Sequence, residues 1–144
     1  MYAVADNKEF LVNTLKESLN WSESIVKSFS LESLKGIYDL LLNRNPVYKA
    51  KVTNHKYKLS MVIPKKIREE LGITYGDRFN IKLNLYKKEL YIYIDDEGKY
   101  KVNDRGIIYL PILLAEKKVI KDKDDVMITV NKNKLTLKSF SYLQ

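Results

Sequence analysis

Two stretches of this chain, residues 57–64 (YKLSMVIP) and residues 104–111 (DRGIIYLP), occupy equivalent places in two similar segments 47 positions apart (111 − 64 = 47). The same offset aligns apolar positions downstream without a gap, as far as Leu83 and its counterpart Val130. An internal repeat of roughly 45 residues is typical of one supersecondary unit used twice, neither copy burying its apolar face alone. The repeat therefore predicts two halves that pack on each other.

The composition is that of a globular chain with a surplus of positive charge. The 144 residues, of which 45% are hydrophobic, suffice for one ordinary core. The absence of cysteine excludes disulfides, and no stretch has the length and apolarity of a membrane span or a secretory leader. We therefore expect a cytoplasmic protein without membrane contact. The formal net charge of +8 favours a phosphate polyanion as partner.

The surplus charge is concentrated in the first repeat. Residues 1–50 hold six basic and six acidic side chains, residues 51–94 hold ten and four, and residues 95–144 hold ten and eight. The net charges of 0, +6 and +2 add up to +8. The first repeat is therefore predicted to be the electropositive half.

Residues 1–45 are predicted to form a helical lobe. Asp6 or Asn7 can cap a first amphipathic helix, which the sequence Asn20-Trp21-Ser22 interrupts. A short helix is expected between Ser22 and Phe29, and a third helix begins after Ser30 and ends before Asn45-Pro46. We expect Trp21 in the core of the lobe, and residues 46–53 as a linker.

In each repeat the pattern changes from alternating to helical and back to alternating. Residues 57–63 predict a strand, Pro64 opens a short helix that Gly72 ends, and Phe79–Leu85 and Leu90–Ile94 predict a hairpin. In the second repeat we expect a strand over Lys101–Leu110, a helix opened by Pro111, and a hairpin of residues 126–130 and 135–137.

The segment IPKKIREELGI (residues 63–73), followed by Gly76-Asp77 and an alternating hairpin, resembles the AbrB/MazE/SpoVT swapped-hairpin DNA-binding family. Residues 101–111 (KVNDRGIIYLP) resemble the opening strand of the same family, so the likeness covers about residues 52–140. It implies an α+β fold in which two copies, residues 52–95 and 99–140 of a domain spanning 52–144, exchange hairpins to close one small β-barrel. Tandem-copy relatives such as MraZ carry both copies in one chain. We expect closure within the chain, and exchange between two chains stays open.

The resemblance implies a transcriptional regulator that binds double-stranded DNA with basic side chains of the opening strands and of the short helix. Arg68 matches the helical arginine of the family, and Lys56, Lys58, Lys101 and Arg105 lie in or beside the opening strands. Lys65 and Lys66 are local additions. Ala115 replaces the arginine in the second repeat, where Lys117 and Lys118 lie nearby. Arginine can bind guanine or phosphate with two parallel hydrogen bonds, and lysine contacts phosphates as a point charge.

Two other interpretations stay open. Arg68 with Glu69 and Glu70 is also compatible with a solvated charge cluster, and Tyr91 and Tyr93 with packing or with stacking on bases. The alternative function is an antitoxin-like or adaptor protein, whose helical lobe binds a protein partner or a second copy. The candidate residues for that contact are Leu31, Leu34, Tyr38 and Leu41.

The sequence shows no arrangement of residues that is typical of a catalytic site. His55 is the single histidine, and Asp95, Asp96 and Glu97 are consecutive residues of a polar turn. No nucleophile elbow, phosphate loop or metal-ligand spacing is present. We therefore expect a non-enzymatic protein with neither cofactor nor metal.

Overall fold

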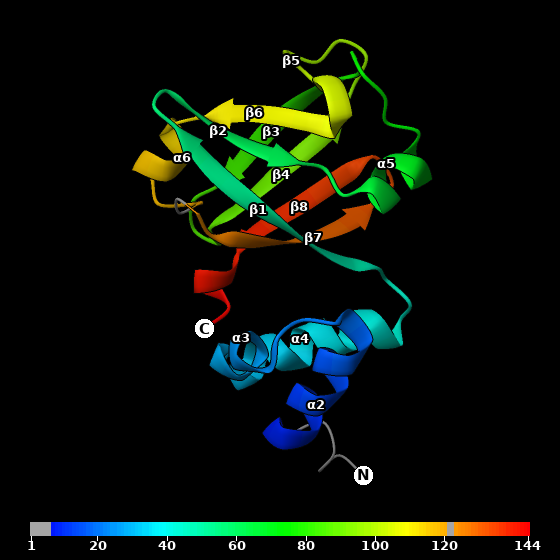
Figure 1. Cartoon of the computed structure of the whole chain (residues 1–144), viewed down its shortest axis with the longest axis vertical. Helices are drawn as coiled ribbons and strands as arrows, with labels where there is room; N and C mark the ends of the chain where they lie inside the picture. The colour runs from blue at the N-terminus through cyan, green and yellow to red at the C-terminus, as the bar shows by residue number, and fades with distance from the viewer. Residues whose placement is uncertain (1–6, 121–122) are drawn as a thin grey trace. The chain divides into compact units, whose positions relative to one another are not determined.

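The computed structural model describes residues 7–120 and 123–144 (Figure 1). They fall into two compact units: residues 7–47 with Leu143 and Gln144, and residues 48–142. The first unit is helical and the second is built around an antiparallel sheet. The chain thus has the mixed α+β class predicted from its sequence.

The helices of the first unit are α2 (Lys8–Leu19), α3 (Glu23–Ser28) and α4 (Leu31–Leu42). The side chains of Asn7, Ser22 and Ser30 each accept a hydrogen bond from the backbone N–H three residues further on, which satisfies a donor that the helix itself leaves free. The alternative cap of the first helix, Asp6, lies outside the described residues. Trp21 is 6% exposed and its ring meets that of Phe29 edge-on, with centroids 6.3 Å apart, as a core residue should.

The second unit contains one eight-stranded sheet that nearly closes into a barrel (Figure 1). Its strands are β1 (Val47–His55), β2 (Lys58–Val62), β3 (Arg78–Asn84), β4 (Glu89–Ile94), β5 (Tyr100–Lys101), β6 (Ile107–Pro111), β7 (Asp125–Asn131) and β8 (Lys134–Ser139). The strand order is β5-β3-β4-β8-β7-β1-β2-β6. The two edge strands, β5 and β6, are joined by the short 3₁₀ turn η1 (Asp104–Gly106), which limits the open edge of the sheet.

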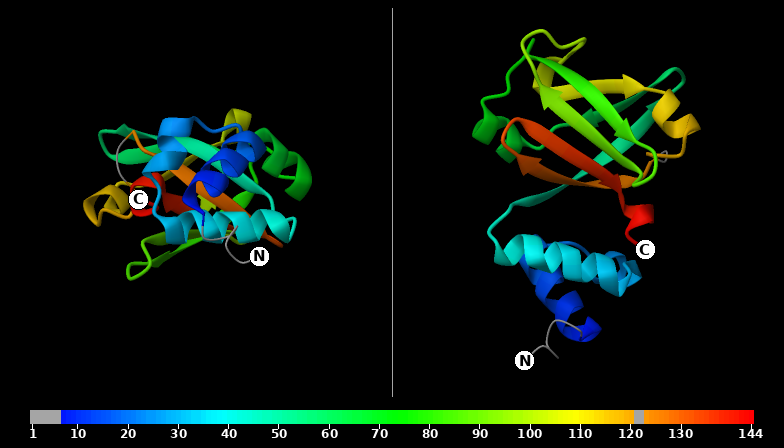
Figure 2. Two further views of the ribbon diagram at one scale, coloured as in Figure 1. Left: turned by 90° about the horizontal axis from the view of Figure 1, so that it is seen from below. Right: turned by 180° about the vertical axis from the view of Figure 1, so that it is seen from behind.

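The first repeat folds largely as its pattern predicts. Helix α5 (Lys65–Leu71) follows β2, and Gly72 ends it in the left-handed conformation with φ of 67°. The hairpins β3–β4 and β7–β8 are also confirmed. Figure 2 shows from behind that these two hairpins lie side by side, because β4 pairs with β8.

Strands of the two halves are neighbours at four places in the sheet, and the β2–β6 and β4–β8 pairings place buried residues opposite each other. Strand β2 pairs with β6, with Met61 opposite Ile108, and β4 pairs with β8, with Leu90 opposite Leu137. All four side chains are buried in one continuous apolar cluster, at most 2% exposed. Burial of apolar surface from both halves at once is the main favourable contribution to the stability of this barrel.

The predicted linker over residues 46–53 is wrong, since residues 47–55 form strand β1. Val52 is fully buried, and Tyr48 and Ala50 pack against the same core. The N–H of Val52 donates to the carbonyl of Asp124 at 3.0 Å, and Val52 pairs with Met61 of β2. Strand β1 therefore fills the gap between β7 and β2, which a flexible linker would leave unpaired.

The predicted single strand over Lys101–Leu110 is also wrong. Turn η1 interrupts it, because Arg105 and Gly106 adopt left-handed conformations with φ of 61° and 76°. Pro111 does not open a helix but ends β6, and helix α6 (Leu113–Glu116) is a single turn. Lys118, with φ of 57°, makes the left-handed turn that glycine makes after α5.

Replacement of Leu137 by alanine tests the packing between the halves. The change removes a fully buried side chain from the centre of the β4–β8 pairing, and we expect a loss of about 2–5 kcal/mol in the free energy of unfolding. Urea denaturation followed by far-UV circular dichroism measures this loss. Leu85→Ala is the matched control, because Leu85 is 49% exposed and its loss should cost less than about 1 kcal/mol. Equal losses in the two variants would contradict the assignment of Leu137 to a shared core.

Candidate nucleic-acid interface

The outward side chains of β1, β2 and β6 form a continuous surface, which we call the opening-strand face. The strand register places them in three rows across the sheet. From β1 to β6 the middle row is Thr53, Ser60 and Tyr109. The other outward positions are Lys51, His55, Lys58, Val62 and Ile107. Apart from Asn54 near the end of β1, the inward positions of the same strands are apolar, so the period of two that builds the core also fixes which side chains face outward.

Contacts between side chains order the middle of this face. The ammonium of Lys58 lies 3.9 Å from the ring centroid of Tyr109, and the ring of His55 meets that of Tyr109 edge-on at 6.4 Å. His55 Nε2 and Ser60 Oγ are 2.8 Å apart, within hydrogen-bonding distance. His55, Ser60 and Tyr109 border a shallow depression of about 240 Å³, which Lys51 also lines. The face therefore presents one aromatic ring with cations around it.

The electrostatics of this face are one-sided. Strands β1, β2 and β6 together contain Lys49, Lys51 and Lys58 and neither aspartate nor glutamate. All three lysines are exposed. Because no carboxylate on these strands offsets them, the face attracts anions, and a polyanion can contact several of the lysines at once.

Further lysines lie at both ends of the β2–β6 pair. Figure 1 shows α5 at one end and α6 at the other. At the α5 end, Lys65 and Lys66 are exposed, and Arg105 lies next to Gly106, which contacts α5. Lys65 Nζ is 3.9 Å from a carboxylate oxygen of Glu69, but both side chains are largely exposed, so this pair holds Lys65 only weakly.

At the α6 end, Lys58 pairs with Pro111, two residues before the start of α6. Lys56 precedes Lys58 at the tip of the β1–β2 hairpin, and Lys117 and Lys118 follow α6; all are exposed. The structure thus brings eight of the nine basic residues singled out in the sequence to the two ends of one strand pair. The ninth, Lys101, lies on β5 and pairs with Arg78 of β3, away from these strands.

Arg68 has a structural partner that sequence reasoning missed. Its Nε donates a hydrogen bond to the carbonyl of Ile63 at 2.9 Å, and its side chain lies directly against Gly106 of the second half. A Cβ on Gly106 would come within 2.5 Å of the Cδ and Nε atoms of Arg68. The N–H of Ile63 in turn donates to the carbonyl of Gly106 at 2.9 Å. Arg68 is therefore half-buried where the two halves meet, and one nitrogen of its guanidinium, Nε, is already hydrogen-bonded within the protein.

Sequence reasoning also missed the part of the face that comes from β1. Lys51 was not assigned to a binding surface, because residues 46–53 were interpreted as a linker, and His55 was considered only as a lone histidine. The available signal was the alternation of Lys49 and Lys51 with Ala50 and Val52, which is typical of a half-buried strand.

Of the residues predicted to bind a protein partner, at least two pack within the helical unit itself. Leu34 is fully buried, and the ring of Tyr38 packs edge-on against Phe10 with centroids 5.8 Å apart. Leu41 is half-buried and Leu31 is 37% exposed. These residues do not form a continuous exposed apolar stripe on α4.

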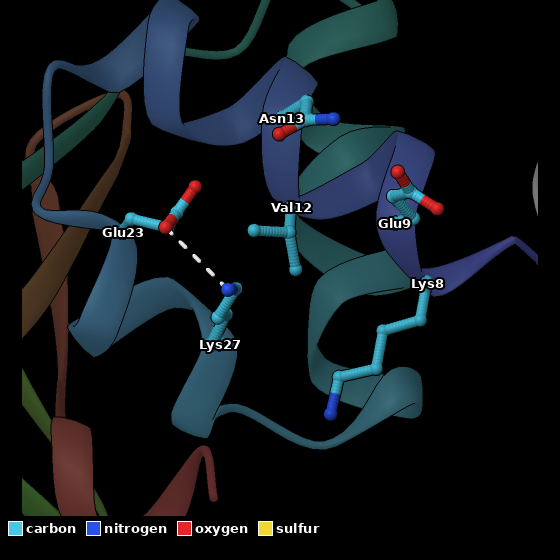
Figure 3. A pocket seen from close by; sticks show the side chains of 6 residues that line it. All are labelled: Lys8, Glu9, Val12, Asn13, Glu23 and Lys27. Atoms are coloured by element: carbon cyan, nitrogen blue, oxygen red, sulfur yellow. Dashed lines mark ion pairs between the residues drawn. The ribbon is translucent and has the colours of Figure 1, made fainter.

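A depression of about 480 Å³ in the helical unit lies between α2 and α3 (Figure 3). Its lining is mostly polar, and Glu23 contacts Lys16 at 3.2 Å and Lys27 at 3.4 Å. The hydrogen bond from Lys16, together with the charges of both lysines, lowers the pKa of Glu23 from its ordinary value. All three side chains are well exposed, so these are surface ion pairs of small energetic effect.

Among residues 7–120 and 123–144, no three His, Cys, Asp or Glu side chains gather in a metal-binding arrangement. Within the same part of the chain, no helix has the length and apolarity to cross a membrane. Protein-family models, curated proteins and solved structures yielded no match to this chain.

The contact between Arg68 and Gly106 can be tested with a matched pair of glycines. Gly72 and Gly106 both have positive φ, but a Cβ on Gly72 would meet no atom within 4 Å. We expect Gly72→Ala to cost about 1–2 kcal/mol in the free energy of unfolding, from backbone strain alone. Gly106→Ala should cost about 1–3 kcal/mol more, because it also displaces the Arg68 side chain and its hydrogen bond.

Chemical denaturation of the variants measures the difference. In an Arg68→Ala background the extra cost of Gly106→Ala should disappear, since the displaced side chain is gone. An extra cost that persists in that background would show that Arg68 does not fill the space beside Gly106.

Proposed function

We propose that residues 48–142 form a pseudo-symmetric swapped-hairpin barrel of the AbrB/MazE/SpoVT type, closed within one chain. The register of the sheet supports this proposal. Met61 lies opposite Ile108 and Leu90 opposite Leu137, and in each pair the positions differ by the repeat offset (108 − 61 = 47; 137 − 90 = 47). A two-fold axis relating the halves requires each residue on the axis to pair with its own repeat counterpart. Two separate strand pairs meet that requirement.

The edge contacts support an exchange of hairpins. Strand β1 of the first half neighbours β7 of the second, and β5 of the second half pairs with β3 of the first. The N–H of Val52 donates to the carbonyl of Asp124, and the N–H of Val102 donates to that of Asp77, whose repeat counterpart is Asp124. Each opening segment thus bonds to the hairpin of the other half. A covalent link between the halves gives them a high effective concentration for this exchange.

The function that we propose is non-enzymatic binding of double-stranded DNA, as a cytoplasmic transcriptional regulator. The opening-strand face carries the proposal, because its three neighbouring strands bear lysines without a single carboxylate. The basic residues at the α5 and α6 ends extend the same surface in both directions. Lysines contact backbone phosphates without regard to sequence, and Arg105 is the residue of this surface with the geometry to bind a base edge or a phosphate through two hydrogen bonds.

The proposed mechanism differs from the family pattern at Arg68. The resemblance implies a DNA contact for that residue, but its Nε is hydrogen-bonded to Ile63 and its side chain packs on Gly106. We therefore propose that Arg68 acts indirectly, by holding turn η1 and the adjacent Arg105 in place. The lysines of the opening-strand face and of α5 make the direct contacts.

A double charge reversal on the opening-strand face tests the function. Fluorescence anisotropy with a labelled random-sequence duplex should detect binding by the wild-type chain that weakens steeply as salt increases, because neutralised phosphates release counterions. We expect Lys51→Glu/Lys58→Glu to weaken binding at low salt by about tenfold or more and to reduce the salt slope by roughly two.

The matched control is Lys87→Glu/Lys132→Glu, which makes the same change in net charge at two exposed lysines of the hairpin tips, outside the opening-strand face. We expect this control to retain most of the wild-type duplex affinity. Equal losses in both double variants would indicate that net charge alone governs binding, and an unchanged affinity in Lys51→Glu/Lys58→Glu would rule out the opening-strand face.

A further inference from the structure

A second surface of the barrel combines aromatic rings with lysines. The outward side chains of β3, β4, β8 and β7 form a grid of three rows, which we call the tyrosine face. Its middle row is Lys82, Tyr91, Thr136 and Thr129, and the rows on either side contain Tyr93 with Lys134 and Glu89 with Lys138. The inward positions between them are core residues, so the orientation of this grid follows from the same period of two.

Tyr91 is held in place on this face by two neighbours. Its hydroxyl donates a hydrogen bond to Glu89 Oε1 at 2.8 Å, and the ammonium of Lys134 lies 5.0 Å from its ring centroid. The bond to Glu89, assisted by burial, raises the pKa of Tyr91 above its ordinary value. The phenol is thus an uncharged, oriented ring with the Lys134 ammonium over one of its faces.

The spacing of the two tyrosine rings allows each ring to contact a different base. Tyr91 and Tyr93 are two residues apart on one strand, which separates their Cα atoms by about 6.8 Å. This separation is twice the 3.4 Å step of bases in a duplex strand, so each ring can take a different, unstacked base. Bases in a duplex are stacked on each other and do not offer their faces, whereas unpaired bases do.

The excess of positive charge on the tyrosine face favours a polyanionic ligand. Lys82, Lys134 and Lys138 outnumber the two outward carboxylates of these strands, Glu89, which already accepts the Tyr91 hydroxyl, and Asp125 at the start of β7. If two copies of this chain met through their tyrosine faces, the lysines of one copy would lie against the lysines of the other. Like charges repel, and each chain has a formal net charge of +8, so a second copy is a poor partner for this face. A ligand with phosphates at the lysines and bases on the rings satisfies both features of the face.

We infer that the tyrosine face is a binding site for single-stranded nucleic acid, in which unpaired bases stack on Tyr91 and Tyr93 while Lys82, Lys134 and Lys138 contact the phosphates. The inference is independent of the proposed duplex binding, because the residues belong to other strands. Stacking of this kind tolerates any base sequence, and the lysines make binding sensitive to salt.

Anisotropy titrations of the full chain test this site. The probes are a labelled oligothymidylate and a labelled oligouridylate, each of about twenty nucleotides, enough to exceed the usual site size of one small barrel. We expect the wild-type chain to bind at least one of them, and the two probes separate a DNA ligand from an RNA ligand. Tyr91→Ala/Tyr93→Ala should weaken binding by about tenfold or more, while Tyr91→Phe/Tyr93→Phe should retain it, because phenylalanine keeps the stacking ring.

Two charge variants test the lysines of this site without changing the tyrosine rings. They also serve as the test if the alanine variant does not fold. Lys82→Glu/Lys138→Glu should lose single-strand binding, and the matched change at the hairpin tips, Lys87→Glu/Lys132→Glu, should retain it. The inference is overturned if the wild-type chain binds neither oligonucleotide, if the folded alanine variant binds as well as the wild type, or if Lys82→Glu/Lys138→Glu binds undiminished. If the wild-type chain binds single strands but not duplex DNA, the proposed function is contradicted and this inference is not.

Discussion

The pairing of β2 with β6 and of β4 with β8 is the interaction on which the rest of the barrel depends. Each pairing joins a strand from before residue 95 to one from after residue 106, and together they place the apolar faces of both segments in one core. A hairpin or a pair of short strands alone exposes too much apolar surface to be stable in water. Closure also fixes which side chains point outward, so both proposed binding faces are consequences of the same pairing.

The two halves are alike in pattern but not in detail, and the differences are concentrated near the opening strands. The first half contributes the nine-residue β1, whereas the second contributes the two-residue β5 and turn η1. Gly106 of that turn leaves room for the Arg68 side chain, and Ala115, at the position equivalent to Arg68, makes no such contact necessary. If the proposed duplex binding holds, this asymmetric surface would suit a site whose two halves differ in sequence or in shape.

The sequence predicted the parts of the fold that local pattern determines. Alternation and turn residues located β2, β3, β4, β7 and β8, and Pro64 with Gly72 bounded α5. Strand β1 was missed because its buried residues are few, and its pairing with β7 joins segments about 70 residues apart, which no local signal encodes. The left-handed Arg105 was missed for the same reason, since contacts with Ile63 and Arg68 stabilise that turn. Of the candidate site, the sequence singled out Lys58 and the lysines at the α5 and α6 ends, which are exposed, but it missed Lys51. The packing of Arg68 could not be inferred without the neighbouring half.

The most direct test of this account is the detection of backbone cross-strand nuclear Overhauser effects between Met61 and Ile108 and between Leu90 and Leu137. A sample that mixes isotope-labelled and unlabelled chains distinguishes contacts within a chain from contacts between chains. The account predicts both contacts, each within a single chain. Absence of both contacts, or their appearance only between labelled and unlabelled chains, would contradict closure of one barrel by one chain.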